Sequence, residues 1–417
     1  MIHIRILLIL AVIALVAHAA EPELGSADFQ PTPERPFGWR GDGTGRFPGA
    51  TPPLEWSLTK NVRWSTVVGR SYSSPILAGK FVFVTAEPNL LICLDRADGK
   101  VLWKAEIKPA DLADEKNRKI ATEYEVDPAG SGMTAATPLT DGKNVYTVFA
   151  NGIVRAVDFS GKTLWTAFID AEQCTGYGRS TSPLLAGGKL IVHMTNLYAF
   201  DPATGKQLWV NLETKSTYAT PAVIKVGGTN LIVTPIGDAV RADDGKTVAA
   251  SIGGSNNVSP VVVDGVIYFC EREVNASRLN AAFKIEEVWT GGIENEVFGS
   301  PLLHDGVLFT VTGKGELIAF NAMAKGATEP LIAPRKLLGE GAGPAGKPVV
   351  YASLTLAGKH LFLNTLTSDI FVLEAAREAK QAAKNTLQSG TGSSPVFSGK
   401  AIYLRDGDKL ICIEDKP

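Results

Sequence analysis

Short apolar runs alternate with polar turns along most of the chain, and one phrase recurs. Each copy has small polar residues and a proline, two or three apolar residues, a glycine-centred turn and an alternating strand-like segment. An eighth copy, at 352–354, reads Ala-Ser-Leu and lacks the proline. A period of roughly 40 residues predicts the four-stranded blades of an all-β propeller, here a single domain of eight blades. The prolines that mark the other seven copies are Pro75, Pro138, Pro183, Pro221, Pro260, Pro301 and Pro395.

A second phrase follows the first in the well-preserved repeats. It is an aspartate-initiated turn that closes on Gly-Lys and leads to tryptophan, as in 95–100 before Trp103 and 201–206 before Trp209. Aspartate accepts hydrogen bonds from the backbone ahead, and glycine accepts a positive φ, so both suit a hairpin turn. The turns lack the ligand spacing of an EF-hand, and we interpret them as structural rather than calcium-binding.

The sequence also predicts how the ring closes. Only four residues follow Ile413, too few for the outer strand of the last blade, whereas 61–65 resembles the outer-strand segments 101–103 and 163–165. We expect 61–65 to insert as the fourth strand of the eighth blade. This insertion joins the two ends and removes the unpaired edge of an open ring.

The first residues are typical of an export signal. Arg5 precedes an apolar run from Ile6 to Ala17, and Ala-His-Ala at 17–19 fits a cleavage site. An uncleaved anchor is the alternative, but about 12 apolar residues fall short of the roughly 20 that span a bilayer. We therefore expect a signal peptide at 1–19, a lead-in at 20–55 and the propeller at 56–417. The mature protein is predicted to be soluble, without a membrane span, and periplasmic or secreted.

Composition narrows the function classes. Lysine and arginine number 41 against 43 acidic residues, so no overall field attracts nucleic acid. Four cysteines are few for an exported chain of 417 residues, and Cys93 and Cys412 occupy matching apolar positions that predict small buried side chains. The histidines are scattered, and neither they nor the cysteines have metal-ligand spacing. We expect no metal and no cofactor.

The segment 199–209, with its Asp-Pro-Ala-Thr-Gly-Lys-Gln-Leu-Trp run, resembles the tryptophan-docking repeat of pyrroloquinoline-quinone-like (PQQ-like) propellers. In that family each tryptophan packs between neighbouring blades. The resemblance covers roughly 56–413 and is clearest in the first three blades, while Ala249 stands at the tryptophan position of the fourth. The WD40 type is disfavoured because the chain has no Trp-Asp dipeptide.

The resemblance implies two function classes. Quinone-dependent dehydrogenases bind their cofactor and calcium at the propeller axis, but the adjacent cysteines of the alcohol enzymes are absent here, and no Asp or Glu pair maps onto the calcium and base positions. The BamB type is a non-catalytic scaffold that docks a partner protein, although this chain lacks its lipid-bearing cysteine. We expect an exported, non-catalytic scaffold that binds an envelope or extracellular protein. A quinone-dependent oxidoreductase and a carbohydrate-binding propeller are the alternatives.

The candidate binding residues lie just before the repeated phrases. In propellers the loops that enter the innermost strands surround the axis, and aromatic and arginine side chains there form protein hot spots or stack on sugars. Ordinary loop composition is the competing interpretation. The candidate axial residues are Arg70, Tyr72, Tyr177, Arg179, Tyr218, Asn257, Phe298 and Tyr351.

Three segments depart from the repeat. An insertion at 108–130 predicts a short charged helix near Asp111, on the same face as the candidate residues. The alanine-rich stretch 374–384 predicts a helical turn in place of a hairpin, and 339–348 a Gly/Pro-rich loop. We interpret the glycine-rich stretch 37–45 as a surface lead-in rather than a phosphate cradle, because no strand-then-helix context follows it.

Overall fold

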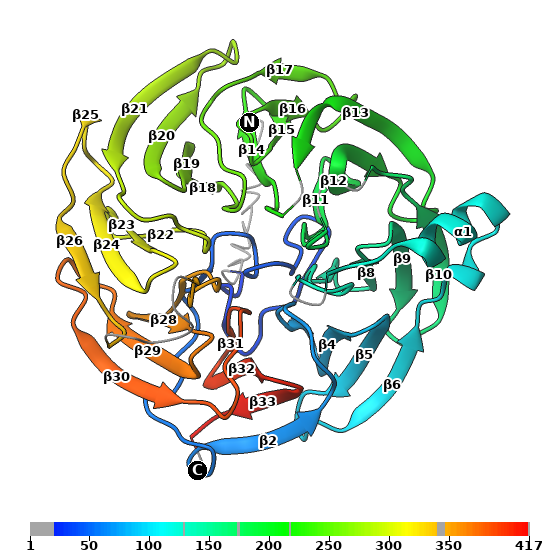
Figure 1. Ribbon diagram of the computed structural model, residues 1–417, viewed down its shortest axis with the longest axis horizontal. Coiled ribbons are helices and arrows are strands. Elements are labelled where there is room, and N and C mark those ends of the chain that lie inside the picture. The colour runs from blue at the N-terminus through cyan, green and yellow to red at the C-terminus, as the bar shows by residue number, and fades with distance from the viewer. Residues whose placement is uncertain (1–20, 128–129, 173–175, 217, 340–346, 416–417) are drawn as a thin grey trace, which may run out of the picture.

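The computed structural model describes residues 21–127, 130–172, 176–216, 218–339 and 347–415. Eight antiparallel sheets stand in a ring around a central axis (Figure 1), which confirms the predicted eight-bladed all-β propeller. The predicted signal segment 1–19 lies outside the described residues, as does most of the predicted 339–348 loop. Within the described ranges, no helix has the length and apolar character needed to cross a membrane.

The first four blades each begin with a short strand beside the axis and end with a strand at the rim. In blade 3 the second and third strands are continuous, and the two ends of that long strand pair with β11 and β13 respectively. These strands are β3 (Ile76–Ala78), β4 (Phe81–Ala86), β5 (Leu90–Asp95), β6 (Val101–Glu106), β7 (Leu139–Thr140), β8 (Asn144–Val148), β9 (Ile153–Asp158), β10 (Thr163–Phe168), β11 (Leu184–Ala186), β12 (Lys189–Phe200), β13 (Gln207–Ser216), β14 (Ala222–Val226), β15 (Thr229–Val233), β16 (Ala239–Arg241) and β17 (Thr247–Ala249).

The last four blades repeat this plan, and two of them gain a fifth strand. A short parallel strand, β25, lies outside blade 5, and the lead-in strand β1 lies on the axial side of blade 7. The strands are β18 (Val261–Val263), β19 (Val266–Cys270), β20 (Glu273–Leu279), β21 (Ile285–Gly292), β22 (Leu302–His304), β23 (Val307–Val311), β24 (Glu316–Asn321), β25 (Gly326–Ala327), β26 (Ile332–Lys336), β27 (Thr355–Ala357), β28 (His360–Asn364), β29 (Asp369–Glu374), β30 (Gln381–Thr386), β31 (Val396–Ser398), β32 (Ala401–Asp406), β33 (Lys409–Ile413), β1 (Arg46–Phe47) and β2 (Val62–Val67).

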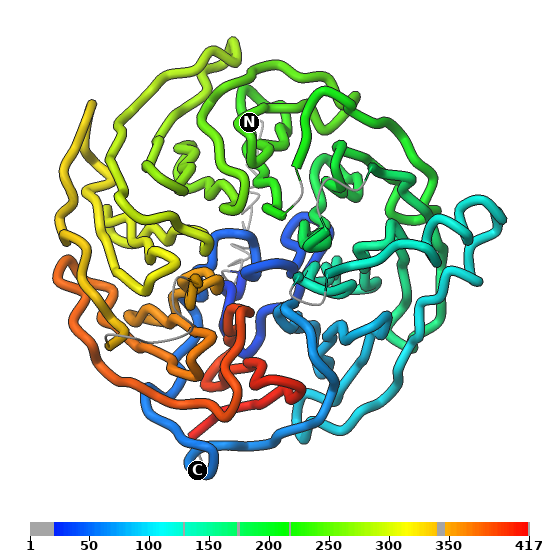
Figure 2. Tube along the Cα trace, viewed as in Figure 1, coloured from blue at the N-terminus to red at the C-terminus, as the bar shows by residue number. Residues whose placement is uncertain are grey.

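The ring closes as predicted, through an N-terminal outer strand. β2 pairs antiparallel with β33, and Trp64 lies opposite Cys412. Figure 2 shows this blue segment at the rim, beside the red strands at the other end of the chain. Cys93 and Cys412 are fully buried free thiols in matching strands, as their apolar surroundings predict.

Tryptophans on the outer strands link successive blades. In each link the indole Nε1 donates to a backbone carbonyl of the next blade at 2.9–3.2 Å. At the first link, a Cβ on Gly99 would lie 2.5 Å from the Trp64 ring, and Gly99 has a φ of +73°. The turn therefore requires glycine both for its backbone and for its contact with the indole. The pairs are Trp64 with Arg96, Trp103 with Phe159, Trp165 with Pro202, Trp209 with Ala242 and Trp289 with Ala322.

The small polar residues of the repeated phrase form a hydrogen-bonded belt around the axis. In seven of the eight, the amide donates to the hydroxyl oxygen of the counterpart in the next blade, at 2.8–3.1 Å. These buried hydroxyls hold the blade entries in register, so their recurrence has a structural cause rather than a nucleophilic one. The belt consists of Ser74, Thr137, Ser182, Thr220, Ser259, Ser300, Ser353 and Ser394.

The insertion forms the predicted charged helix. A 3₁₀ turn, η1 (Pro109–Asp111), precedes α1 (Glu115–Glu123), whose N-cap Asp114 accepts the Asn117 amide at 2.9 Å. Asp111 pairs with the buried Arg155 of blade 2 at 2.6 Å. The insertion is thereby fixed against blade 2, and α1 projects beyond the rim (Figure 1).

The prediction for 374–384 was wrong. This stretch ends β29, turns through residues with no helix, and begins β30, so a hairpin is kept. Pairing across the sheet, for example Val372 with Ala383, prevails over the local helix propensity of alanine. The turn is also held from blade 6, because the Arg335 guanidinium donates to the carbonyls of Glu378 and Ala379.

The interpretation of 37–45 as a surface lead-in was wrong. The lead-in crosses the centre of the ring (dark blue in Figure 2), and its apolar side chains are buried. Phe37 lies 6.2 Å from Phe47, which contacts Phe397 of blade 8 at 5.4 Å between ring centroids. Arg40 reaches deeper and donates to the carbonyls of Pro301 and Leu354 at 2.9 and 2.7 Å. The buried apolar residues of this stretch are the aromatic ones among the glycines. The polar residues around them led to the prediction of a surface segment.

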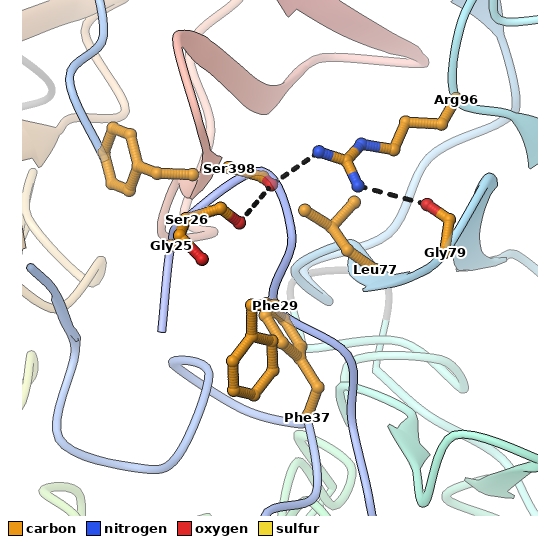
Figure 3. Close-up of a pocket in the computed structure, with 9 residues that line it drawn as sticks. Gly25, Ser26, Phe29, Phe37, Leu77, Gly79, Arg96 and Ser398 are labelled. Carbon is orange, nitrogen blue, oxygen red and sulfur yellow. Dashed lines mark hydrogen bonds between the residues drawn. The ribbon is translucent and has the colours of Figure 1, made fainter. Parts of the chain in front are cut away.

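Polar contacts fasten the start of the lead-in to blades 8 and 1 (Figure 3). Ser398 Oγ donates to the Ser26 carbonyl at 3.1 Å, and Arg96 donates both to Ser398 Oγ and, at 3.1 Å, to the Gly79 carbonyl. The cavity beside them measures about 10 Å³. It has room for about one water molecule, so we assign it no ligand.

Candidate binding face

The two ends of the ring are different surfaces. Residues that precede the innermost strands form one end, which we call the loop face. The turns that leave those strands form the other end, which the lead-in covers: the Thr51 amide donates to the Gly399 carbonyl at 2.8 Å, and the Gly399 amide to the Gly25 carbonyl at 2.7 Å. All eight candidate residues belong to the loop face.

Three of the candidates come together from different blades. The rings of Phe298 and Tyr351, at the entries to blades 6 and 7, are 5.1 Å apart and tilted by 47°. Gly392 lies between the two tyrosines and allows them to approach: a Cβ on it would be 3.0 Å from the Tyr72 ring and 3.8 Å from Tyr351 Cβ. Tyr72 and Tyr351 remain 49% and 44% exposed. We call Tyr72, Phe298 and Tyr351 the aromatic cluster.

Burial raises the pKa of Tyr351, and the neighbouring Tyr72 adds to the rise. Tyr351 therefore keeps its hydroxyl proton at neutral pH. Tyrosine rings with hydroxyl groups suit packing and hydrogen bonding.

Arg179 is not available as a binding side chain. It is buried, and it donates to the carbonyls of Ala150 and Ala171 at 2.9 and 2.6 Å. Its guanidinium carbon lies 4.9 Å from the centroid of the Tyr124 ring, at the end of the insertion. The arginine fixes loops of blades 2 and 3, whereas Tyr177 beside it is 57% exposed.

Asn257, Tyr218 and Arg70 make contacts outside the cluster. Asn257 is half-buried, and its Nδ2 donates to Glu271 Oε1 at 2.9 Å, which orders its own loop. Tyr218 is half-buried next to Tyr124, whose pKa it helps to raise. Arg70 is exposed, and its carbonyl accepts the amide of Glu87 at 2.8 Å.

Sequence reasoning missed Arg405, a buried arginine in β32. It donates to the Ser73 carbonyl at 2.7 Å and to the Gly69 carbonyl at 3.1 Å, so it supports the segment that carries Tyr72. Burial lowers its pKa to about 10, which leaves it charged at neutral pH. A charged residue inside an otherwise apolar strand was the signal available in the sequence.

Acidic side chains described on the loop face bond to the backbone. The carboxylates of Glu87 and Glu271 accept backbone amides in different blades, those of Thr134 and Asn256. In the part of the chain that the structure describes, no three His, Cys, Asp or Glu side chains are grouped to hold a metal ion. The exposed rings on these fixed loops are suited to binding by contact.

Eight blades, the repeated Trp-containing turn and an N-terminal closing strand make the chain similar to the PQQ-like class of propellers. A family model described as outer membrane protein assembly factor BamB matches residues 54–105 and 116–233, which cover the first three blades and half of the fourth. The chain thus resembles BamB.

Relatives agree with this likeness. Outer membrane protein assembly factor BamB of Yersinia pestis is 26% identical over 259 residues, 55% of this chain and 60% of that protein, so the alignment spans less than two thirds of it. The crystal structure of BamB from Moraxella catarrhalis has a TM-score of 0.60 at 13% identity, over 84% of this chain and 96% of that one. A quinohemoprotein alcohol dehydrogenase from Pseudomonas putida has a TM-score of 0.54 at 13% identity, over 88% and 78%. The last two likenesses are of fold.

Proposed function

We propose that this protein is an exported, non-catalytic scaffold that binds another envelope protein through the aromatic cluster of its loop face. The observation that carries the proposal is the meeting of Tyr72, Phe298 and Tyr351 from three separate blade entries. Aromatic side chains clustered on a partly exposed surface are the commonest hot spots of protein interfaces. The assembly role named for the BamB relatives supports the same class of function.

The belt beneath the cluster favours binding as well. Amide-to-hydroxyl bonds around the axis hold the loop entries. The backbone that carries the aromatic side chains is therefore already ordered before a partner binds. Less conformational entropy is then lost on association, and more of the contact energy remains as affinity. We infer a docking surface that changes little in shape when it is occupied.

Export to the envelope is part of the proposal. The basic start, apolar run and small-residue site at 1–19 support a cleaved signal, and the BamB likeness supports an envelope location. The absence of a cysteine directly after the apolar run favours a protein that is not lipid-anchored at that position.

The test is recovery of a partner from the protein's own cross-linked envelope fraction. Tagged mature protein is compared with the double variant Tyr72→Ala, Tyr351→Ala and with Leu102→Ala, an exposed apolar residue on the outer strand β6. Docking by the cluster is supported if wild type and Leu102→Ala both recover a partner that the double variant does not. Equal recovery by all three rejects the cluster as the site.

Carbohydrate binding is the second candidate, because exposed tyrosine rings also stack on sugars. Titration with a panel of soluble oligosaccharides separates the two functions. Saturable sugar binding that is lost in the double variant, with no protein recovered, would replace the docking scaffold by a glycan receptor.

A further inference from the structure

The innermost strands are covered unequally. β3, β7, β27 and β31 are buried along their whole length, whereas β11, β14 and β18 in blades 3, 4 and 5 each keep partly exposed residues. The lead-in explains the difference, since its buried side chains contact blades 8, 1, 2 and 7. Among the described residues, the side of the channel at blades 3, 4 and 5 is therefore left uncovered.

The covered side shows that innermost strands accept an additional backbone. β1 pairs parallel with β27, and Phe37 forms an antiparallel bridge with Thr140 of blade 2. In that bridge the two amides donate to the opposite carbonyls at 2.9 and 2.8 Å. Strand addition at the axial edge is thus a geometry that this fold already uses twice.

On the open side, a cleft of about 370 Å³ separates the lead-in from blades 3, 4 and 5. The blade wall is apolar and includes Leu184, Val223 and Val262. The lead-in wall is mixed: it includes the charged residues Glu34 and Asp42 beside apolar ones such as Trp39. No residue of the aromatic cluster lines the cleft, so the site is separate from the proposed docking surface.

Ala222 and Val223, which line this wall, are the first residues of the longest innermost strand. β14 has five residues, Ala222–Val226, and it is the terminal strand of its sheet, with no described strand on its axial edge. Its side chains alternate: Val223 is 38% exposed and Lys225 is exposed, while Ile224 and Val226 are buried. An open edge with alternating exposure is a template for one more strand.

The charge of the cleft favours a basic occupant. Arg35, which also lines it, is paired with Glu21 at 2.8 Å. Within the described ranges no lysine or arginine lies within salt-bridge distance of Glu34 or Asp42. The lining therefore presents two carboxylates, Glu34 and Asp42, beside the paired Arg35, and a cationic side chain of a ligand would complement Glu34. The charge of Asp42 is partly offset by the buried Arg40 nearby.

We propose that the cleft binds an extended peptide segment of a partner protein, which pairs as a strand with the axial edge of β14. Alternate side chains of a strand point to opposite sides, so apolar residues pack on Val223 and Val262 while basic residues face Glu34 and Asp42. Five residues of β14 correspond to about 17 Å, the length of about five extended residues of ligand.

The probe is a fluorescein-labelled heptapeptide of alternating valine and lysine, titrated into the mature protein and followed by fluorescence anisotropy. We expect saturable binding. The same peptide with N-methyl groups on its central amides should bind at least tenfold more weakly, because it cannot pair with the strand edge. Val223→Asp should weaken binding by at least tenfold, whereas Val67→Asp, on the exposed outer strand β2, should change it less than twofold.

A charge swap keeps the test valid if Val223→Asp disturbs the fold. Glu34 is exposed, so Glu34→Lys should leave the fold intact. It should weaken binding of the valine-lysine peptide and strengthen binding of a valine-glutamate peptide. The proposal is overturned by unsaturable binding, by equal affinity for the N-methylated peptide, or by insensitivity to both Val223→Asp and Glu34→Lys. Saturable binding of an oligosaccharide in place of the peptide would also overturn it.

Discussion

The Ser74 hydroxyl donates a hydrogen bond to the carbonyl oxygen of Ser394 at 2.9 Å, across a separation of 320 residues. This contact joins the last blade to the first and completes the belt around the axis. Ser394 Oγ in turn accepts the amide of Ser353 at 3.0 Å and donates to its carbonyl at 3.0 Å. A single hydroxyl therefore serves as both acceptor and donor for the neighbouring blade.

Removal of that hydroxyl should destabilise the ring. Ser394→Ala leaves a buried amide and a buried carbonyl without their partner, which costs about 1–3 kcal/mol. Urea unfolding followed by tryptophan fluorescence measures the loss. Ser65→Ala, at an exposed position of β2, is the control, and equal midpoints for the two variants would contradict the role of the belt.

Gly99→Ala should destabilise the fold more than the addition of one methyl group usually does. The new methyl group meets the Trp64 ring at 2.5 Å, and the backbone must hold a φ of +73°. We expect a loss of about 2 kcal/mol or more, from steric overlap and backbone strain together. Gly292→Ala is the matched control, because a Cβ there has no neighbour within 4 Å; an equal loss of thermal stability in both would contradict the prediction.

The buried His193 should make stability depend on pH. Burial lowers its pKa to about 3, below the ordinary value of 6.5. The unfolded chain therefore binds the proton more readily, and the stability contributed above pH 6.5 is lost progressively as the pH falls toward 3. At pH 5 the loss reaches about 2 kcal/mol.

Unfolding free energies of wild type and His193→Leu, measured from pH 7 to 4, isolate this contribution. The variant should show a shallower fall, while His304→Gln, at a partly exposed histidine, should follow wild type. Parallel curves for His193→Leu and wild type would show that His193 does not carry the effect.

Arg40 should anchor the lead-in. Arg40→Ala removes the donors to Pro301 and Leu354 and leaves a cavity near the axis. We expect hydrogen exchange of the amides at 37–47 to accelerate at least tenfold, with the blade strands unchanged. Arg35→Ala removes a pair with Glu21, a bond to the Pro22 carbonyl and a contact with the Phe29 ring, all N-terminal to 37–47, and should leave those amides protected; if both variants exchange alike, the anchor lies elsewhere.

The fold was predictable because each copy of the repeat contains the residues that determine its own local structure. Proline and glycine mark the ends of seven of the eight innermost strands, and the closing strand at 61–65 is recognisable from its likeness to other outer strands. The lead-in was not predictable by the same means. It occurs once, and its burial depends on a channel that exists only after eight blades have assembled.

The candidate site was predictable only in part. Position before the repeated phrase correctly identifies which residues lie at one end of the ring. It does not indicate which side chains remain exposed, so buried Arg179 and exposed Tyr177 look alike in the sequence. Gly392, which brings Tyr72 and Tyr351 close together, carries no signal of its own because its importance is the absence of a side chain.

The closing strand imposes an order on folding. β2 at 62–67 is made early, but its partner β33 at 409–413 is made last, and β1 likewise waits for β27 at 355–357. The segment that emerges first therefore acquires its strand partners last, after nearly the whole chain has been delivered. Any factor that receives this chain as it emerges must keep those early strands from pairing with other chains until the ring can close.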